Sequence, residues 1–155
     1  MSKSLKRVRA ALLAHELDDT IVETGQATTA QMAADEIGCE VDQIVKSILF
    51  IGETSGECIL FLTVGGNQVD PDKAAKLAGE PLVKANAAAI RAQTGFAIGG
   101  VSPLGHLKTP RAFFDPKLMT FAEIWGAAGT PRHVFSAPPA QIQRFSSAQI
   151  SEFTK

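Results

Sequence analysis

Lys46 is the residue whose type fits its surroundings least. It stands inside an apolar run at residues 44–51, IVKSILFI. Alternate side chains of a strand point to opposite faces, so Lys46 is expected to share a face with Ile48 and Phe50. A buried lysine is costly unless its ammonium group reaches water or an anion. Two interpretations stay open: a lysine that reaches the surface or pairs with an acid, and a cation in a cleft that binds the phosphate or carboxylate of a substrate.

A glycine-rich segment about fifty residues later is the second candidate. Residues 95–106, GFAIGGVSPLGH, contain four of the 13 glycines. Gly99 and Gly100 allow a close approach of the backbone, and successive free N–H groups can bind an anion or an oxyanion. Pro103 stiffens the loop, and His106 at its end could be a base, a hydrogen-bond donor or a plain surface histidine. The alternative for the whole segment is a tight turn between strands.

Several other chemistries have no motif in this sequence. There is no nucleotide P-loop, no dinucleotide-binding turn and no G-x-S-x-G nucleophile motif. Cys39 and Cys58 form no C-x-x-C pair, and His15, His106 and His133 are far apart in the chain. We therefore expect no metal site, no disulfide, no cofactor and no covalent nucleophile.

The candidate residues need elements that position them. Apolar spacing and capping residues predict a helix over 4–17, one from Thr28 with Gln31 as capping partner to Gly38, and one from Pro71 to Gly79. Further helices are expected after Asn86, and at 121–128, from 139 and in the tail.

Strands are expected between these helices. They are predicted at 20–23, 44–51, 58–64, 96–98, 112–114 and 133–136. The runs 44–51 and 58–64 are apolar on both faces, which indicates two central strands joined as a hairpin. Because helices and strands mix without strict alternation, we predict an α+β fold with a mixed sheet.

Composition is typical of one globular domain over residues 1–155, with a net charge of −1. No secretory signal and no apolar run of about 20 residues is present, so we expect a cytoplasmic protein with no membrane contact. A near-neutral chain is not expected to bind nucleic acid over a broad basic face. However, residues 1–9 carry four bases and no acid, residues 10–45 carry eight acids and no base, and residues 103–155 carry six bases and three acids. These are either solvated faces or basic chain ends beside an anion site.

The strand VDQIVKSILF and the loop TGFAIGGVSPLGH, taken together, resemble the YbaK/ProX family of aminoacyl-tRNA deacylases, which are similar to the editing domain of bacterial prolyl-tRNA synthetases. Weaker similarity covers the Thr28-Thr29 helix start and the stretches FDPKLMTFAEIW and AGTPRHVFSAPPAQI. The resemblance implies a single α+β domain with a mixed, curved sheet. It also implies a trans-editing enzyme that cleaves a wrong amino acid from a tRNA, with a mischarged tRNA acceptor end as partner and a prolyl-tRNA or other synthetase as a candidate partner.

Within the resemblance, Lys46 lies in the substrate pocket and the loop with Gly99, Gly100 and residues 102–105 faces it. Ser47 stands where the branch acting on alanyl-tRNA(Pro) usually has Asn, which indicates cysteinyl-tRNA(Pro) or small hydroxyl amino acids instead. The resemblance implies no catalytic role for His106.

In the resulting hypothesis, Lys46 binds the phosphate or ribose of the terminal adenosine. The N–H groups of Gly99 and Gly100 stabilise the developing oxyanion. Water or a substrate group attacks, without an acyl-enzyme. Expected substrate contacts and pocket walls are Thr28, Thr29, Met32, Ile48, Phe50, Phe96, Ile98, Ser102, Pro103, Gly105 and His106. The alternatives are a non-catalytic module for a tRNA end, a nucleotide or an aminoacyl group, and a protein-interaction domain. A monomer is the default.

Overall fold

The computed structural model describes residues 2–25 and 27–155. Within these residues the larger sheet has five strands in the order β4-β2-β3-β5-β8. Strand β2 is antiparallel to β3 and β4, whereas β5 is parallel to β3 and β8, so the sheet is mixed. The predicted hairpin and its two central strands are confirmed. The strand bounds are β2 Val45–Gly52, β3 Cys58–Val64, β4 Leu82–Lys84, β5 Arg111–Phe114 and β8 Gln149–Ile150.

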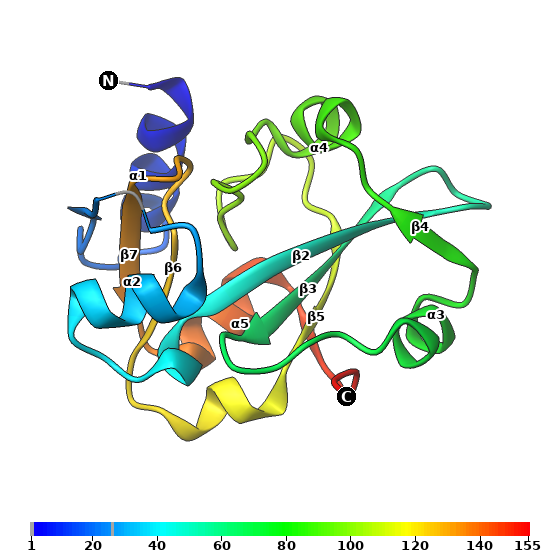
Figure 1. Ribbon diagram of the computed structural model, residues 1–155. Coiled ribbons are helices and arrows are strands. Elements are labelled where there is room, and N and C mark those ends of the chain that lie inside the picture. The colour runs from blue at the N-terminus through cyan, green and yellow to red at the C-terminus, as the bar shows by residue number, and fades with distance from the viewer. Residues whose placement is uncertain (1, 26) are drawn as a thin grey trace.

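A smaller sheet stands beside the start of β2. In the described part of the chain it has three strands in the order β1-β7-β6, with bounds Val22–Glu23, His133–Ala137 and Ile124–Ala127. A single bridge between Ile44 and Trp125 connects it to the larger sheet. Figure 1 shows the small sheet and α2 (Ala30–Ile37) at one end of β2, and β4 and α3 (Pro71–Ala78) toward the other.

Two helices begin and end where capping residues predict. Asp70 accepts hydrogen bonds from the backbone N–H groups that follow it, Pro71 is the first residue of α3, and Gly79 ends it in the left-handed conformation. Asn86 caps α4 (Ala87–Thr94) in the same way. The other helices are α1 Lys3–Ala14, α5 Pro139–Ser146 and the 3₁₀ turns η1 Val41–Gln43 and η2 Pro116–Thr120.

Strand β3 organises the core because all of its positions are buried. Leu60, Leu62 and Val64 pack in the larger cluster, which also contains the buried stripe of α1. Phe61 points to the opposite face, where its ring stacks on Phe113 at a centroid distance of 5.2 Å. The α+β fold with a mixed sheet, predicted from the sequence, is confirmed.

Some predicted elements are wrong. Residues 96–98 form no strand, because the chain turns there and the Gly100 N–H donates to the Ala97 carbonyl at 3.0 Å. Residues 121–128 form no helix and contain strand β6 (Ile124–Ala127), in which Ile124 and Gly126 are buried alternately with their neighbours. The helical turn in this region is η2 instead, where Asp115 accepts a hydrogen bond from the Lys117 N–H.

Other differences are smaller. Strand β4 was not predicted, and the tail pairs with β5 as β8 instead of forming a helix. The first predicted strand is reduced to Val22–Glu23. Helix α2 is capped by Thr29, whose side chain accepts from the Met32 N–H, and not by Thr28. That shift of one residue leaves Thr28 in the segment before the helix.

Candidate functional site

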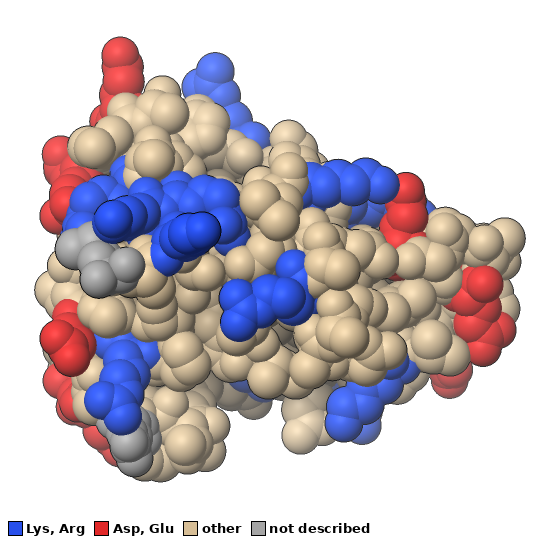
Figure 2. Space-filling view, turned by 90° about the horizontal axis from the view of Figure 1, so that it is seen from above, with Lys and Arg blue, Asp and Glu red and all other residues tan. Residues whose placement is uncertain are grey.

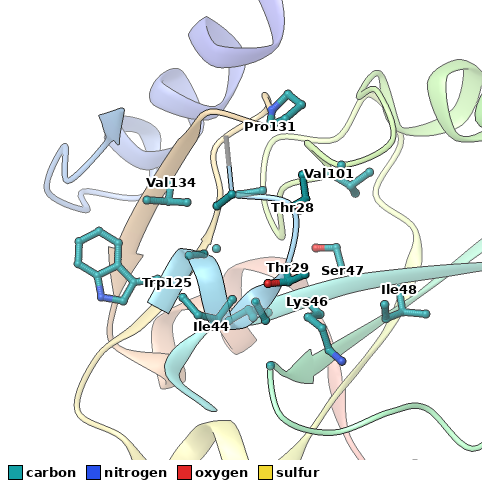
Figure 3. Close-up of a pocket in the computed structure, with 18 of the residues that line it drawn as sticks. Thr28, Thr29, Ile44, Lys46, Ser47, Ile48, Val101, Trp125, Pro131 and Val134 are labelled. Atoms are coloured by element: carbon teal, nitrogen blue, oxygen red, sulfur yellow. The ribbon is translucent and has the colours of Figure 1, made fainter. Parts of the chain in front are cut away.

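A cleft of about 870 Å³ lies between the small sheet, α2, the start of β2 and the turn at residues 98–101. Its volume is in the range of small-molecule sites. Of the residues singled out in the sequence, Thr28, Lys46, Ile48, Ile98 and Gly99 line it, which brings together segments far apart in the chain. Figure 3 shows Thr28, Ser47, Val101, Pro131 and Val134 around this space.

Lys46 lies at the edge of the cleft with its ammonium group already in contact with the protein. Its Nζ donates a hydrogen bond to the carbonyl of Asn67, in the segment after β3. Figure 3 shows its side chain leaving β2 on the side opposite Ser47. Burial lowers the pKa of Lys46, and the nearby Asp42 carboxylate offsets part of that effect. Since the Asn67 carbonyl takes one of the three donors of an ammonium group, Lys46 has further donors for an anion.

Asp42 does not neutralise Lys46, because other groups bind it. Its carboxylate forms an ion pair with Lys117 at 2.8 Å and accepts a hydrogen bond from the Gly66 N–H at 2.8 Å. The contact with Lys117 is the main cause that lowers the pKa of Asp42. Of the two interpretations of Lys46, a cation at the wall of a cleft therefore fits the geometry better than a direct salt bridge.

The two glycines of the loop differ. Gly99 lines the cleft with φ +86°, and within the described residues its N–H donates no hydrogen bond. The N–H of Gly100 is used by the turn at Ala97, so the expected free N–H at this position is wrong. A side chain at 100 would lie 2.8 Å from the Thr130 backbone. Gly100 thus serves close packing, and the next N–H on the cleft wall without a partner in the described chain is that of Val101.

The second half of the loop lies behind the cleft wall. Ser102 is fully buried, and its hydroxyl oxygen accepts from the Leu104 N–H at 3.1 Å. Pro103 packs against Gly126. The carbonyl of Gly105 accepts from the Arg7 guanidinium at 2.7 Å. The structure therefore places these three candidates between the loop, β6 and α1, and they do not line the cleft.

His106 and Phe50 also lie away from the cleft. The His106 Nε2–H donates to the Ser102 carbonyl at 2.5 Å, and its ring meets the Phe96 ring edge-on. Its Nδ1 has no partner within the described residues, and burial lowers the pKa of His106 to about 4. Phe50 packs edge-on against Phe61 on the other face of the sheet. His106 is therefore a neutral, buried group at ordinary pH.

Sequence reasoning missed His133. It lies on the cleft wall in β7, and its Nδ1 is 2.6 Å from the Thr130 hydroxyl. The Thr130 oxygen also accepts from the Arg132 N–H, which fixes the turn before β7. Which partner donates between Thr130 and His133 depends on the histidine tautomer. Within the described chain the second ring nitrogen of His133 has no partner. The spacing of Thr130 and His133 in GTPRH was the available signal.

Ser47, which the sequence offered only as a marker of amino acid specificity, also belongs to the site. It lines the cleft, and its hydroxyl is buried without a hydrogen-bond partner in the described part of the chain. An unpaired buried hydroxyl costs about 1–3 kcal/mol. In Figure 3 Ser47 lies on the same side of β2 as Val101 and Thr28.

Two further observations concern the described residues only. They contain no group of three or more His, Cys, Asp or Glu side chains placed to hold a metal ion. None of their helices is both long and apolar enough to cross a membrane.

With the fold and the cleft described, comparison with known proteins identifies the class. Residues 24–145 match the family model of the aminoacyl-tRNA editing domain. The matched segment contains the cleft-lining β2, the turn at 98–101 and β7. The chain belongs to the aminoacyl-tRNA editing domain family, which confirms the resemblance to the YbaK/ProX proteins.

Individual relatives agree with this assignment. The uncharacterized protein YwhH of Bacillus subtilis (strain 168) is 32% identical, over 95% of this chain and 94% of its own. EbsC of Enterococcus faecalis (strain ATCC 700802 / V583), named a putative Cys-tRNA(Pro)/Cys-tRNA(Cys) deacylase, is 25% identical, over 81% of this chain and 77% of its own. A crystal structure described as a putative trans-editing enzyme for prolyl tRNA synthetase superposes with a TM-score of 0.91 at 41% identity, covering 100% of this chain and 99% of that one.

Proposed function

We propose that this protein is a trans-editing aminoacyl-tRNA deacylase. It hydrolyses the ester between a mischarged small amino acid, of the Cys, Ser, Thr or Ala class, and the terminal adenosine of a tRNA, with tRNA(Pro) as the first candidate. The observation that carries the proposal is the cleft itself. In a chain of the editing family, one cleft is lined by Lys46, by His133 and by Gly99, whose N–H has no partner among the described residues.

The proposed reaction is direct hydrolysis. A water oxygen bonds to the ester carbonyl carbon, the C–O bond to the ribose breaks, and the ribose oxygen takes a proton, which releases free amino acid and tRNA. No acyl-enzyme is invoked, because Ser47 on the cleft wall has no basic partner in the described chain. The protein's contribution is position and charge stabilisation.

Each group has a role in this scheme. Lys46 binds a phosphate or the ribose of the terminal adenosine by a charge-assisted hydrogen bond. The N–H groups of Gly99 and Val101 stabilise the carbonyl oxygen as it becomes negative, and loss of one such donor typically costs about 10²–10³ in rate. His133, held by Thr130, orients the attacking water or the ribose hydroxyl. Gly100 has a positioning role, because its lack of a side chain lets the turn approach Thr130.

The amino acid side chain is proposed to occupy the apolar end of the cleft between Ile48, Ile98 and Thr28. An apolar pocket discriminates a single methylene by only about 1–3 kcal/mol, so a small pocket excludes larger residues better than it separates small ones. Ser47, in place of Asn, favours Cys or a small hydroxyl amino acid over Ala. The relative EbsC is named a putative Cys-tRNA(Pro)/Cys-tRNA(Cys) deacylase, which supports Cys as the first amino acid to test.

The proposal extends to the whole chain. Helix α1 precedes the matched residues 24–145, but its Leu5, Val8 and Leu12 are buried in the same core cluster as β3. We therefore propose one domain over 1–155, acting as a monomer in the cytoplasm, where translation supplies the tRNA. The proposal includes recruitment by a prolyl-tRNA synthetase or another synthetase.

The second candidate is a non-catalytic module that binds a tRNA end. The observation that favours it is that Lys46 and Asn67 are already hydrogen-bonded, as in a preformed anion site. A panel of mischarged tRNAs separates the two. Catalytic release of free amino acid supports the enzyme, whereas tight binding without release supports the module and contradicts the proposed deacylase.

A further inference from the structure

Three segments distant in the chain meet beside the cleft. The Ser4 hydroxyl donates to the Gly95 carbonyl at 3.3 Å, which connects the start of α1 to the end of α4. Arg7 strengthens this connection with a hydrogen bond to the same carbonyl at 2.8 Å. Gly129 approaches the Ser4 carbonyl so closely that a side chain at 129 would lie 2.7 Å from it. The start of α1, the end of α4 and the turn before β7 therefore form one continuous surface.

This surface brings together basic side chains without acidic partners. Lys3 and Lys6 come from the first turns of α1, Arg91 from α4 and Arg132 from the turn before β7, and all four are exposed. In the described chain none of the four forms an ion pair with a carboxylate. We call these four residues the basic rim. Arg91 and Arg132 flank the cleft, because Ile90 and Pro131, their neighbours in sequence, line it. Lys3 and Lys6 lie on the start of α1, which contacts both of these segments through Gly95 and Gly129.

Several bases outside the rim form ion pairs. Lys108 pairs with Glu57 at 3.0 Å and Lys117 with Asp42 at 2.8 Å, so most of the excess positive charge of residues 103–155 is locally compensated. Lys3 and Lys6 also lie at the positive end of the α1 dipole, where a cation is unfavourable, so helix stability does not explain them. Burial and, to a smaller extent, the neighbouring Arg91 lower the pKa of Arg7, which lies between the rim residues.

Figure 2 shows this side of the molecule from above. Lys and Arg side chains extend across the middle of the face, whereas Asp and Glu occupy its left and right margins. Like charges close together repel one another and destabilise the fold, so we expect a partner of opposite charge to bind this face.

We propose that the basic rim binds the phosphodiester backbone of the acceptor stem of the tRNA whose 3′ end enters the cleft. This rests on the proposed function, because it takes the ester to lie in the cleft. The stem of a tRNA is a phosphate-lined duplex that continues from the single-stranded 3′ end, so the rim beside the cleft meets it. Contacts of this kind add affinity for any tRNA sequence, and selectivity stays with the cleft.

The test compares two substrates and two matched variants. The double variant Lys3→Ala/Lys6→Ala removes two charges from the rim, and Lys73→Ala/Lys76→Ala removes two from α3. Each is assayed for kcat/KM at several salt concentrations with mischarged full-length tRNA and with an aminoacylated CCA trinucleotide that has no stem. Arg132→Ala, on a separate element, provides a second rim variant if α1 is perturbed.

The rim variant is expected to lose about tenfold or more in kcat/KM on tRNA at 0.1 M salt, and its log–log salt slope should become shallower by about 2, or one per contact. The trinucleotide rate and the α3 variant should be unchanged. An unchanged salt slope on tRNA, or an equal loss of kcat/KM on both substrates, would contradict the proposal that the basic rim binds the stem.

The two proposals fail in distinguishable ways. If the wild-type protein hydrolyses neither substrate, the deacylase is wrong, and the salt dependence of uncharged tRNA binding by the same variants still decides the rim. If the wild-type protein hydrolyses both and the rim variant matches it on tRNA, only the rim is wrong.

Discussion

Ser47 and His106 each have one buried polar atom without a partner among the described residues, and they show that residue type alone does not define a role. The sequence drew attention to His106 because it ends a glycine-rich loop, yet its ring donates to the Ser102 carbonyl behind the cleft. It offered Ser47 only as a marker of amino acid specificity, although the Ser47 hydroxyl is buried on the cleft wall. Lys46 could be identified because a charged residue in an apolar strand is anomalous by itself. His133 could not, because its significance arises only when β7 pairs beside Thr130.

Ser47→Ala should leave the unfolding free energy unchanged or raise it by up to about 1 kcal/mol, because it removes a hydroxyl that is desolvated without a hydrogen bond. The matched control is Ser146→Ala, whose hydroxyl donates to the Gln143 carbonyl at 3.1 Å. The control should lose about 0.5–1.5 kcal/mol. Urea unfolding of both variants measures this, and a loss above about 1 kcal/mol for Ser47→Ala would show that its hydroxyl has a structural partner.

His106 should make the protein less stable in mild acid. Its pKa is lowered to about 4 in the fold, below the ordinary 6.5, so the unfolded chain binds the proton more tightly. The stability that neutral His106 contributes is complete above pH 6.5 and is lost as pH falls from 6.5 through 4.

The size of this effect between pH 7 and pH 5 is about 2 kcal/mol. Wild type and His106→Gln are compared by urea unfolding at both pH values, so that other titrating groups cancel. The wild-type protein should lose about 2 kcal/mol more than the variant over this interval. Equal losses would contradict the neutral, buried state of His106.

At the scale of elements, local signals predict helices well and short strands poorly. Asp70, Asn86 and the glycines at helix ends define α3 and α4 because capping is a contact within a few residues. Strands β4 and β8 are short and depend on partners distant in the chain, and β6 reads as a helix until its pairing with β7 is known. The segment 96–98 was mistaken for a strand because the turn closed by Gly100 has no apolar signature.

Gly100→Ala tests whether the turn at 98–101 depends on its contact with the small sheet. The added Cβ would lie 2.8 Å from the Thr130 backbone, and backbone cannot move away as a flexible side chain can. We expect a loss of about 1–3 kcal/mol in unfolding free energy. The comparison is Gly56→Ala, where φ is +70° and no atom lies within 4 Å, so that only backbone strain is added.

The Gly100 variant should also lose order at residues 129–132, measured as faster amide hydrogen exchange there, whereas Gly56→Ala should not. A Gly100→Ala protein with wild-type stability and unchanged exchange at 129–132 would show that the two segments are not in contact.

At the scale of the whole molecule, the distribution of charge was more informative than its total. A net charge of −1 excludes a broad basic face, but not a local one. Of the two basic chain ends noted in the sequence, the first contributes Lys3 and Lys6 to the rim and the second contributes Arg132, whereas Arg9, Lys108 and Lys117 pair with acids elsewhere. That selection depends on tertiary contacts of α1, which no local pattern contains. The family, the α+β class and the site at β2 were accessible from the sequence, whereas the division of the loop into a cleft half and a buried half was not.

The most direct test of the central claim is a single-turnover measurement of free amino acid released from Cys-tRNA(Pro) by wild type and by Lys46→Ala. Lys108→Ala, which removes an exposed lysine paired with Glu57, is the control. The account predicts release by wild type and by the control, and a rate at least about 10²-fold lower for Lys46→Ala, whose circular dichroism spectrum and melting temperature stay close to wild type. A Lys46→Ala protein that releases cysteine at the wild-type rate would contradict the role of Lys46 in this cleft.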